Sequence, residues 1–432
     1  MPTAGVGQRV WGGGLRVSGG GLRDGPGRRA ELASAMVERP LVVGAGAAGL
    51  AVAAGLAGRG LTCDVLDSAS SVGAVWADRY DSLRLHTARR LSGLPGLPIP
   101  ARYGAWVARD DVVAYLGRYA DHHRLALELG VQVRRLDREG DHWVVRTSAG
   151  DRRTTQVVLA TGFCRRPLLP DWAAAEVGAA TGAATGAEHT GKHGVAAGSR
   201  GASSPVVLHS SAYRSAAGYR GGRVLVVGAG NSGSEIAADL AASGVEVLVS
   251  VRRPPDLVRR DLLGVPSQAL AIATRGLPAG VVDRLSRVLR RLSFPDLTGY
   301  GLPAPARAAA RPGLPATIPI LDHGFIAAVR SGRIRVVGAV AALADGAVTL
   351  VDGTSVAVTA VVCATGYRPG LDELVGPLGV LDEHGSPRVH GAATLPGAPG
   401  LRFAGIGATR TGQLREIGRE ARAIAAVVAA AG

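Results

Sequence analysis

Short apolar runs alternate with Ala-rich stretches of helical periodicity along most of the chain. Runs of this length, rich in Val and Leu, predict buried strands. Because strands that are joined by helices pair in parallel, the alternation predicts an α/β protein with parallel sheets. The expected strands lie at 41–43, 61–66, 157–162, 224–227, 245–251, 361–366 and 401–407, and helices are expected near 110–129 and over 411–430.

Two of these strands end in the same glycine pattern, G-x-G-x-x-G, and each is followed by an Ala-rich helix. The pattern occurs at Gly44, Gly46 and Gly49 and again at Gly228, Gly230 and Gly233. In such a turn the first glycine allows a tight bend, the second lets the backbone approach a pyrophosphate, and the third lets the helix pack on the strand. The pyrophosphate then meets the unpaired N–H groups of a helix N-terminus. Two such turns predict two bound dinucleotides, which is typical of a redox relay.

The residues that follow each turn distinguish the two ligands. Asp67 ends the strand after the first turn, where a carboxylate accepts hydrogen bonds from ribose hydroxyls and repels a 2′-phosphate. Arg252 and Arg253 end the strand after the second turn, and a guanidinium suits a 2′-phosphate, which favours NADPH over NADH. Asn231 and Ser232 open the second helix and are expected to cap its phosphate side.

Composition narrows the possible partners. No apolar run in the 432 residues reaches the ~20 that a membrane helix needs, so no membrane span is expected. The net charge of +15 comes almost entirely from scattered arginines without an interleaved aromatic patch, which speaks against specific nucleic-acid binding. The three cysteines form no C-x-x-C pair, and no His/Cys cluster has metal-ligand spacing. We therefore expect no metal, and we expect a cytoplasmic protein.

The order of the elements predicts a discontinuous first domain. Residues 1–35 are glycine-rich without hydrophobic periodicity, and we interpret them as a disordered or non-native extension that ends before Met36. The first dinucleotide domain is expected over 36–170 and 316–432, and the second over 205–315. A low-complexity insertion is expected over 171–204.

Two further strands end in the tripeptide Ala-Thr-Gly. The turns Thr161-Gly162 and Thr365-Gly366 each follow one nucleotide unit. We expect both at crossings between the domains, where the backbone passes close to a cofactor.

Several linked segments between about Glu38 and Val428 carry a family resemblance. Besides the first glycine turn, these are Gly73 to Trp76, Arg79 to His86, Tyr213-Arg214, Tyr219 to Gly221, Leu321 to Gly324, and Ala364 to Pro369. Together they resemble the flavin-containing monooxygenases, which are class B flavoprotein monooxygenases, and most closely the plant-type indole-3-pyruvate (YUCCA-like) members. His209 and Tyr213 match the family's identifying stretch, in which Ser203 replaces a Phe and Pro205 replaces a Gly.

The resemblance implies a glutathione-reductase-like fold of two Rossmann-like domains, with the NADPH domain inserted into the FAD domain. It implies that NADPH reduces FAD, that O₂ adds to give a flavin hydroperoxide, and that this species oxygenates a small organic substrate such as a 2-oxo acid or ketone. It places Trp76 and Tyr80 in the wall of the FAD pocket and His209 in the cofactor-binding region.

Two alternatives stay open for His86 and two for the function. His86 either lies over the flavin edge and donates to the oxygen or to a substrate carboxylate, or it packs as a support for FAD. The rival functions are a flavin-dependent NAD(P)H oxidase or reductase that oxygenates nothing, and a non-catalytic dinucleotide-binding sensor. The sequence leaves the oligomeric state open.

Overall fold

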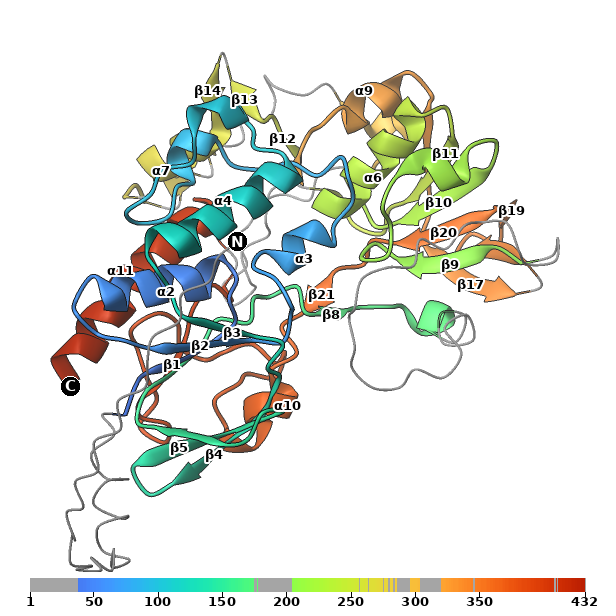
Figure 1. Cartoon of the computed structure of the whole chain (residues 1–432). Coiled ribbons are helices and arrows are strands. Elements are labelled where there is room, and N and C mark those ends of the chain that lie inside the picture. Colours follow the sequence, from blue (N-terminus) through green and yellow to red (C-terminus); the bar gives the residue numbers. More distant parts are fainter. Residues whose placement is uncertain are drawn as a thin grey trace, which may run out of the picture. The chain divides into compact units, whose positions relative to one another are not determined.

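The computed structural model describes residues 38–174, 177, 204–255, 257–262, 264–274, 276–278, 280–282, 284–285, 296–303, 320–344, 346–407, 409 and 411–431 (Figure 1). The expected N-terminal extension, Met36, Ser203 and most of the expected insertion lie outside these residues. Helix is present at 171–174, and Ala173 is fully buried in an apolar cluster, so the first residues of the expected insertion are part of the folded core.

The first sheet has five parallel strands in the order β22-β7-β1-β2-β3. Their bounds are β1 (Leu41–Val43), β2 (Asp64–Asp67), β3 (Leu127–Leu129), β7 (Val157–Leu159) and β22 (Leu401–Phe403). The central strands are buried because both faces of the sheet are covered. One face is covered by the helices α2 (Ala47–Ala57), α4 (Arg109–His122) and α11 (Gln413–Ala431). The other face is covered by an antiparallel sheet of β4 (Val133–Glu139), β5 (His142–Thr147) and β6 (Arg152–Thr154).

Helices α2 and α11 run side by side on one face of this sheet (Figure 1). A Cβ atom on Gly55 of α2 would lie only 3.0 Å from the Cβ atom of Ala425 in α11. Small residues at this crossing therefore let the C-terminal helix pack on the helix that follows the first glycine turn.

The second sheet repeats this plan with the strand order β16-β11-β10-β20-β9, again all parallel. Its strands are β9 (Val206–His209), β10 (Arg223–Val227), β11 (Glu246–Ser250), β16 (Ile334–Val337) and β20 (Ala360–Cys363). Alternate side chains of β10 enter different cores: Val224 and Val226 pack with α6 (Asn231–Ala242) and α9 (Phe325–Arg330), while Leu225 faces the opposite side. That side is covered by β17 (Val340–Ala344), β18 (Ala347–Leu350) and β19 (Ser355–Ala357).

The strand pairing moves one expected domain boundary. Strands β16 and β20 were expected in the first domain, which was to resume at residue 316, yet both pair within the second sheet. The second sheet therefore continues to Cys363. An apolar strand pattern does not specify which of two parallel sheets a strand joins, and this explains the difference.

The two connections between the sheets meet each other. Strand β8 (Arg166–Pro167) follows the first sheet, β21 (Tyr367–Arg368) follows the second, and the two pair in antiparallel register. The remaining elements are α3 (Ala74–Ala77), β12 (Leu257–Val258), β13 (Asp261–Leu262), β14 (Val265–Pro266), α7 (Ser267–Ala273), β15 (Ile320–Leu321) and α10 (Asp372–Val375). Among the described residues, no helix combines the length and the apolar character that a membrane crossing requires. The predicted fold of two Rossmann-like units is confirmed.

Candidate active site

The first glycine of each turn has a backbone that only glycine adopts without strain. Gly44 has a φ of +108° and Gly228 a φ of +100°. A Cβ on Gly44 would lie 2.6 Å from the carbonyl oxygen of Ala160, and one on Gly228 would lie 2.7 Å from that of Ala364. The Ala-Thr-Gly turns that begin at these alanines thus lie directly against the glycine turns, which brings Thr161 and Thr365 to the two expected cofactor sites.

The other glycines divide into a crowded pair and an open pair. A Cβ on Gly49 would meet the carbonyl oxygen of Gly44 at 1.7 Å, and one on Gly233 would meet that of Gly228 at 1.9 Å. By contrast, a Cβ on Gly46 or Gly230 would have no atom of the described residues within 4 Å, apart from its own chain neighbours and helix backbone. Both open glycines are the N-cap residues of their helices, α2 and α6. Each turn therefore offers free space at a helix N-terminus, which fits a pyrophosphate.

Asp67 lies at the mouth of the first turn. Its Oδ2 accepts a hydrogen bond from the backbone N–H of Ala45 at 2.6 Å, and its Oδ1 accepts one from Ala69 at 2.8 Å. These bonds fix the carboxylate at the end of β2, beside the helix that begins after Gly46. The position suits the predicted contact with an adenosine ribose.

The residues around the second turn are arranged differently. The N–H of Gly228 donates to the carbonyl oxygen of Ser250, which brings the end of β11 to the turn. Arg252 and Arg253 follow at once and are exposed. The Oδ1 of Asn231 accepts a hydrogen bond from the backbone N–H of Leu321 at 3.2 Å, so this atom anchors β15 rather than a phosphate. Ser232 lies in the first turn of α6 and is half-buried.

His209 is the last residue of β9 in the second sheet, and its side chain contacts the connection that follows β20. Its Nε2 is 3.1 Å from the carbonyl oxygen of Gly366, and its ring meets the ring of Tyr367 edge-on at 4.8 Å. The guanidinium of Arg79 lies over the Tyr367 ring, with its carbon 4.7 Å from the ring centroid. Burial lowers the pKa of His209 to about 4, so the imidazole is neutral near pH 7. Gly162 has a φ of +75° at the start of the outgoing connection.

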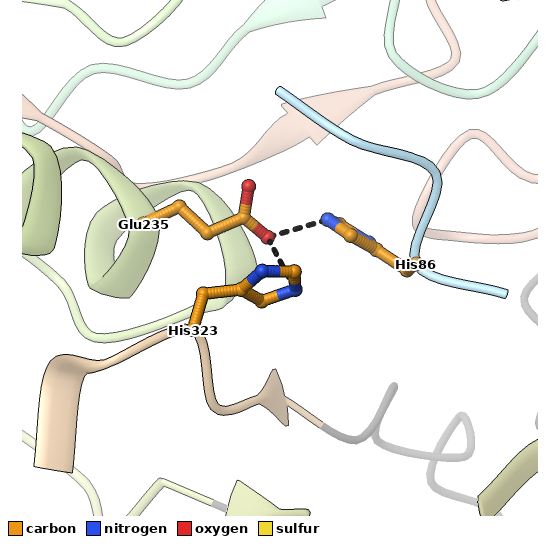
Figure 2. Close-up of side chains that lie close together, drawn as sticks. All are labelled: His86, Glu235 and His323. Atoms are coloured by element: carbon orange, nitrogen blue, oxygen red, sulfur yellow. Dashed lines mark ion pairs between the residues drawn. The ribbon is translucent and has the colours of Figure 1, made fainter. Parts of the chain in front are cut away.

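A buried carboxylate brings together side chains that are distant in sequence (Figure 2). Glu235, in the second turn of α6, is only 6% exposed. The hydroxyl of Tyr80 donates to its Oε2 at 2.8 Å, and the Nε2 of His86 lies 2.5 Å from its Oε1. The Nε2 of His323 lies 3.7 Å from the same oxygen. We call Tyr80, His86, Glu235 and His323 the Glu235 cluster; it joins the segment after α3 to the helix of the second glycine turn.

The pKa shifts in the Glu235 cluster follow from burial and from the contacts between its members. Burial by itself lowers the pKa of His86, but the charge and hydrogen bond of Glu235 outweigh it and raise the pKa above the usual 6.5. Burial likewise raises the pKa of Glu235, and the charge of His86 reverses this, so the net change is downward. Burial lowers the pKa of His323. The contact between His86 and Glu235 thus favours the protonated ring and the ionised carboxylate, whereas burial favours the neutral form of His323.

The same three groups have the chemistry of a metal site, although spacing in the sequence predicted none. His86, Glu235 and His323 each place one ligand atom within 4.8 Å of the others. Two ligands of one zinc ion, at bonds of about 2.0–2.1 Å, lie roughly 3 Å or more apart. The 2.5 Å between the Nε2 of His86 and the Oε1 of Glu235 is shorter and fits a direct ion pair.

The predicted pocket residues Trp76 and Tyr80 lie where the two apolar cores meet. Tyr80 is 3% exposed, and Trp76 is half-buried and packs against the core clusters of both sheets. Sequence reasoning did not select Glu235, and it noted His323 only as part of the matched segment Leu321 to Gly324, with no role assigned. The one signal available for Glu235 is a charged residue beside Ile236 on the otherwise apolar inner face of a helix.

Comparisons with known proteins agree with this architecture. Residues 41–188 match the family described as pyridine nucleotide-disulphide oxidoreductase, and residues 202–376 match the flavin-binding monooxygenase-like family. Indole-3-pyruvate monooxygenase YUCCA1 of Oryza sativa subsp. japonica is 32% identical over 334 residues, which cover 76% of this chain and 76% of that protein. Probable indole-3-pyruvate monooxygenase YUCCA9 of Arabidopsis thaliana is 29% identical over 385 residues, with 87% and 85% covered.

Solved structures share the fold at lower identity. A flavin-containing monooxygenase from Stenotrophomonas maltophilia has a TM-score of 0.67 and 23% identity, over 91% of this chain and 98% of that one. Cyclohexanone monooxygenase from Rhodococcus sp. Phi1, bound to NADP⁺, has a TM-score of 0.63 and 18% identity, over 91% and 84%. With two glycine turns shaped for dinucleotides and these relatives, the chain belongs to the flavin-containing monooxygenases, among which the YUCCA enzymes are similar to it.

Proposed function

We propose that the protein is an NADPH-dependent FAD monooxygenase that oxygenates a small organic acid or ketone. The observation that carries this proposal is the pair of open glycine turns, at Gly46 and Gly230, with the Glu235 cluster linking the two units. FAD, when bound, would supply the oxygen chemistry, with NADPH as the source of the reducing equivalents. The chain would supply the positions of the two nucleotides and a candidate proton donor near the reaction.

Each nucleotide has a set of residues that favours it. Gly44, Gly46 and Gly49 form the turn for FAD, with Asp67 placed for its ribose and Trp76 and Tyr80 for the pocket wall. Gly228, Gly230 and Gly233 form the turn for NADPH. The exposed Arg252 and Arg253 follow β11, where a 2′-phosphate is recognised in this fold, and they support NADPH over NADH.

His86 is the candidate proton donor. Burial lowers the pKa of its ring, but Glu235, whose Oε1 lies 2.5 Å from the Nε2, raises this pKa overall and so favours the protonated ring. A proton held at this atom can be given to a developing oxyanion, and its charge attracts a carboxylate. The hydroxyl of Tyr80 donates to the second oxygen of Glu235 and so fixes the direction of the pair.

The substrate class is proposed from the relatives. Two of them are named as indole-3-pyruvate monooxygenases, and indole-3-pyruvate is a 2-oxo acid. A 2-oxo acid is therefore the first class to examine, with ketones second.

The test is the fate of the electrons from NADPH. Purified protein that contains FAD is mixed with NADPH and air, and NADPH loss and H₂O₂ release are recorded with and without phenylpyruvate. A monooxygenase releases less peroxide per NADPH when its substrate is present, and an oxygenated product accumulates. Peroxide equal to NADPH with every compound offered would favour the oxidase, and FAD-containing protein that leaves NADPH unchanged would favour the sensor.

A further inference from the structure

Arg260 is held against an aromatic ring, and its charge acts on the Glu235 cluster. It lies between β12 and β13, is half-buried, and places its guanidinium carbon 4.0 Å from the centroid of the Trp106 ring. The carbonyl oxygen of Trp106 in turn accepts a hydrogen bond from Arg84 at 3.2 Å. A guanidinium stacked on an aromatic ring has one face covered and its N–H edges free to bind a ligand.

Two N–H groups of Arg260 have no partner. Its Nε and Nη2 are both buried, and neither has a hydrogen-bond partner among the described residues. These two nitrogens share one edge of the guanidinium, the planar fork that matches the two oxygens of a carboxylate. Because burying a charged donor without a partner is costly, these two nitrogens indicate a ligand that accepts hydrogen bonds from both of them.

Among the residues that the structure describes, no carboxylate forms an ion pair with Arg260. Burial and the positive charge of Arg84 lower the pKa of Arg260 to about 10, while Glu235 and Asp261 act in the opposite direction. Both oxygens of Glu235 already meet Tyr80 and the two histidines. Asp261 is exposed. An anion from outside the chain would therefore complete the site.

The position of Arg260 relates this anion to the reaction. The charge of Arg260 lowers the pKa values of both His86 and His323, which shows that it lies within electrostatic range of these rings. The phosphates of the two nucleotides already have the glycine turns at Gly46 and Gly230. A ligand on Arg260 would instead lie in the region whose charge acts on the candidate proton donor.

We propose that Arg260, oriented by Trp106, binds the carboxylate of the substrate through its Nε and Nη2 groups and so makes the enzyme selective for small organic acids. This inference rests on the proposed function, because that function places the reaction near His86. Arg260 is a binding residue in this scheme, and Arg84 adds a positive charge to its surroundings.

The experiment compares two ligands that differ only in the carboxylate. Phenylpyruvate and phenylacetone share the benzyl ketone, and a methyl group replaces the carboxylate in the second. Their dissociation constants are measured by calorimetry on the oxidised, FAD-containing protein, for the wild type, Arg260→Gln, Arg260→Lys and the control Arg259→Gln, which changes the exposed neighbour. FAD content and melting temperature are recorded for each, to show that the fold is retained.

We expect Arg260→Gln to weaken phenylpyruvate binding by about 10- to 100-fold, the range for losing charge-assisted hydrogen bonds to a carboxylate. The binding of phenylacetone should be unchanged. Arg260→Lys keeps the charge without the fork, so its loss should be smaller, and Arg259→Gln should resemble the wild type. The proposal is overturned if the wild type does not prefer phenylpyruvate, or if Arg260→Gln weakens both ligands equally. It is also overturned if NADP⁺ binding weakens in place of phenylpyruvate binding, which would make Arg260 a phosphate ligand.

Binding is measured without turnover, so the result does not depend on oxygenation. A protein that releases all its electrons as peroxide would refute the proposed function, yet the ratio of the two dissociation constants would still decide whether Arg260 binds a carboxylate. Conversely, a coupled monooxygenase whose phenylpyruvate affinity is unchanged in Arg260→Gln would keep its proposed function and lose this assignment.

Discussion

Replacing Gly46 with valine separates cofactor binding from folding. Gly46 has a φ of −79° and a ψ of −174°, a conformation that any L-residue adopts, and a Cβ there meets no protein atom within 4 Å. The loss of the N-cap glycine should therefore cost only about 1 kcal/mol of unfolding free energy. The side chain would, however, occupy the space in which the pyrophosphate meets the helix N-terminus.

The magnitude follows from the hydrogen bonds that the pyrophosphate would lose. Each charge-assisted bond contributes about 1.5–3 kcal/mol, so losing two raises the dissociation constant of FAD by roughly 10²- to 10⁴-fold. Gly49→Ala should act in the opposite way. Its Cβ would lie 1.7 Å from the carbonyl oxygen of Gly44, so helix α2 must shift at a cost of about 1–3 kcal/mol or more.

The assay is flavin absorbance per protein after purification, with reconstitution of the apo-protein followed by quenching of flavin fluorescence. Gly117→Val is the matched control, since Gly117 lies in α4 and its Cβ also has free space. We expect Gly46→Val to be colourless and to melt, as apo-protein, near the wild-type apo-protein, whereas Gly49→Ala should melt lower. Stoichiometric flavin in Gly46→Val, or a melting temperature as low as that of Gly49→Ala, would refute the reasoning.

Three further changes probe the second unit and the Glu235 cluster. Gly230→Val should keep the protein yellow but abolish its reduction by NADPH, because the open space at the second turn is filled; normal reduction would contradict this. Arg252→Ala combined with Arg253→Ala should raise KM for NADPH and leave KM for NADH nearly unchanged, and equal effects would remove the preference. Glu235→Gln removes the charge that raises the pKa of His86, so in the variant this pKa falls. The raised pKa of His86 stabilises the fold fully below its ordinary value of 6.5, and the lowered pKa of Glu235 stabilises it fully above its ordinary value of 4.5. The difference in unfolding free energy between wild type and variant should therefore be largest between pH 4.5 and 6.5. It should shrink as the pH rises through the pKa of folded His86. Urea unfolding at a series of pH values measures it, and a difference that does not depend on pH would exclude the ion pair.

The parts of the fold that the sequence predicted are those governed by local patterns. The glycine turns, the strands before them and the last helix follow from periodicity and from the geometry that Gly44 and Gly228 require. The end of the second unit was missed because β20 pairs with β10 across more than a hundred residues of chain. Such pairing depends on the packing of whole layers, which no short window of sequence contains.

The candidate site was only partly predictable for the same reason. The resemblance drew attention to His86, and the structure supplies the partner that sets its charge, Glu235, from a different sheet unit. Arg260 was one arginine among many in an arginine-rich chain. Arg260 is distinguished by its stacking on Trp106 and by two buried nitrogens without hydrogen-bond partners among the described residues. Both features arise only in the folded chain, where Trp106 lies against Arg260.

The antiparallel contact between β8 and β21 has a consequence for motion. The backbone leaves the unit of the first sheet once and returns once, and at this contact the two passages are paired as antiparallel strands. Any displacement of one unit against the other would therefore have to bend this ribbon, besides disturbing the contacts of the Glu235 cluster. Nicotinamide and flavin would then approach and separate along one path, with the same faces presented to each other in every cycle.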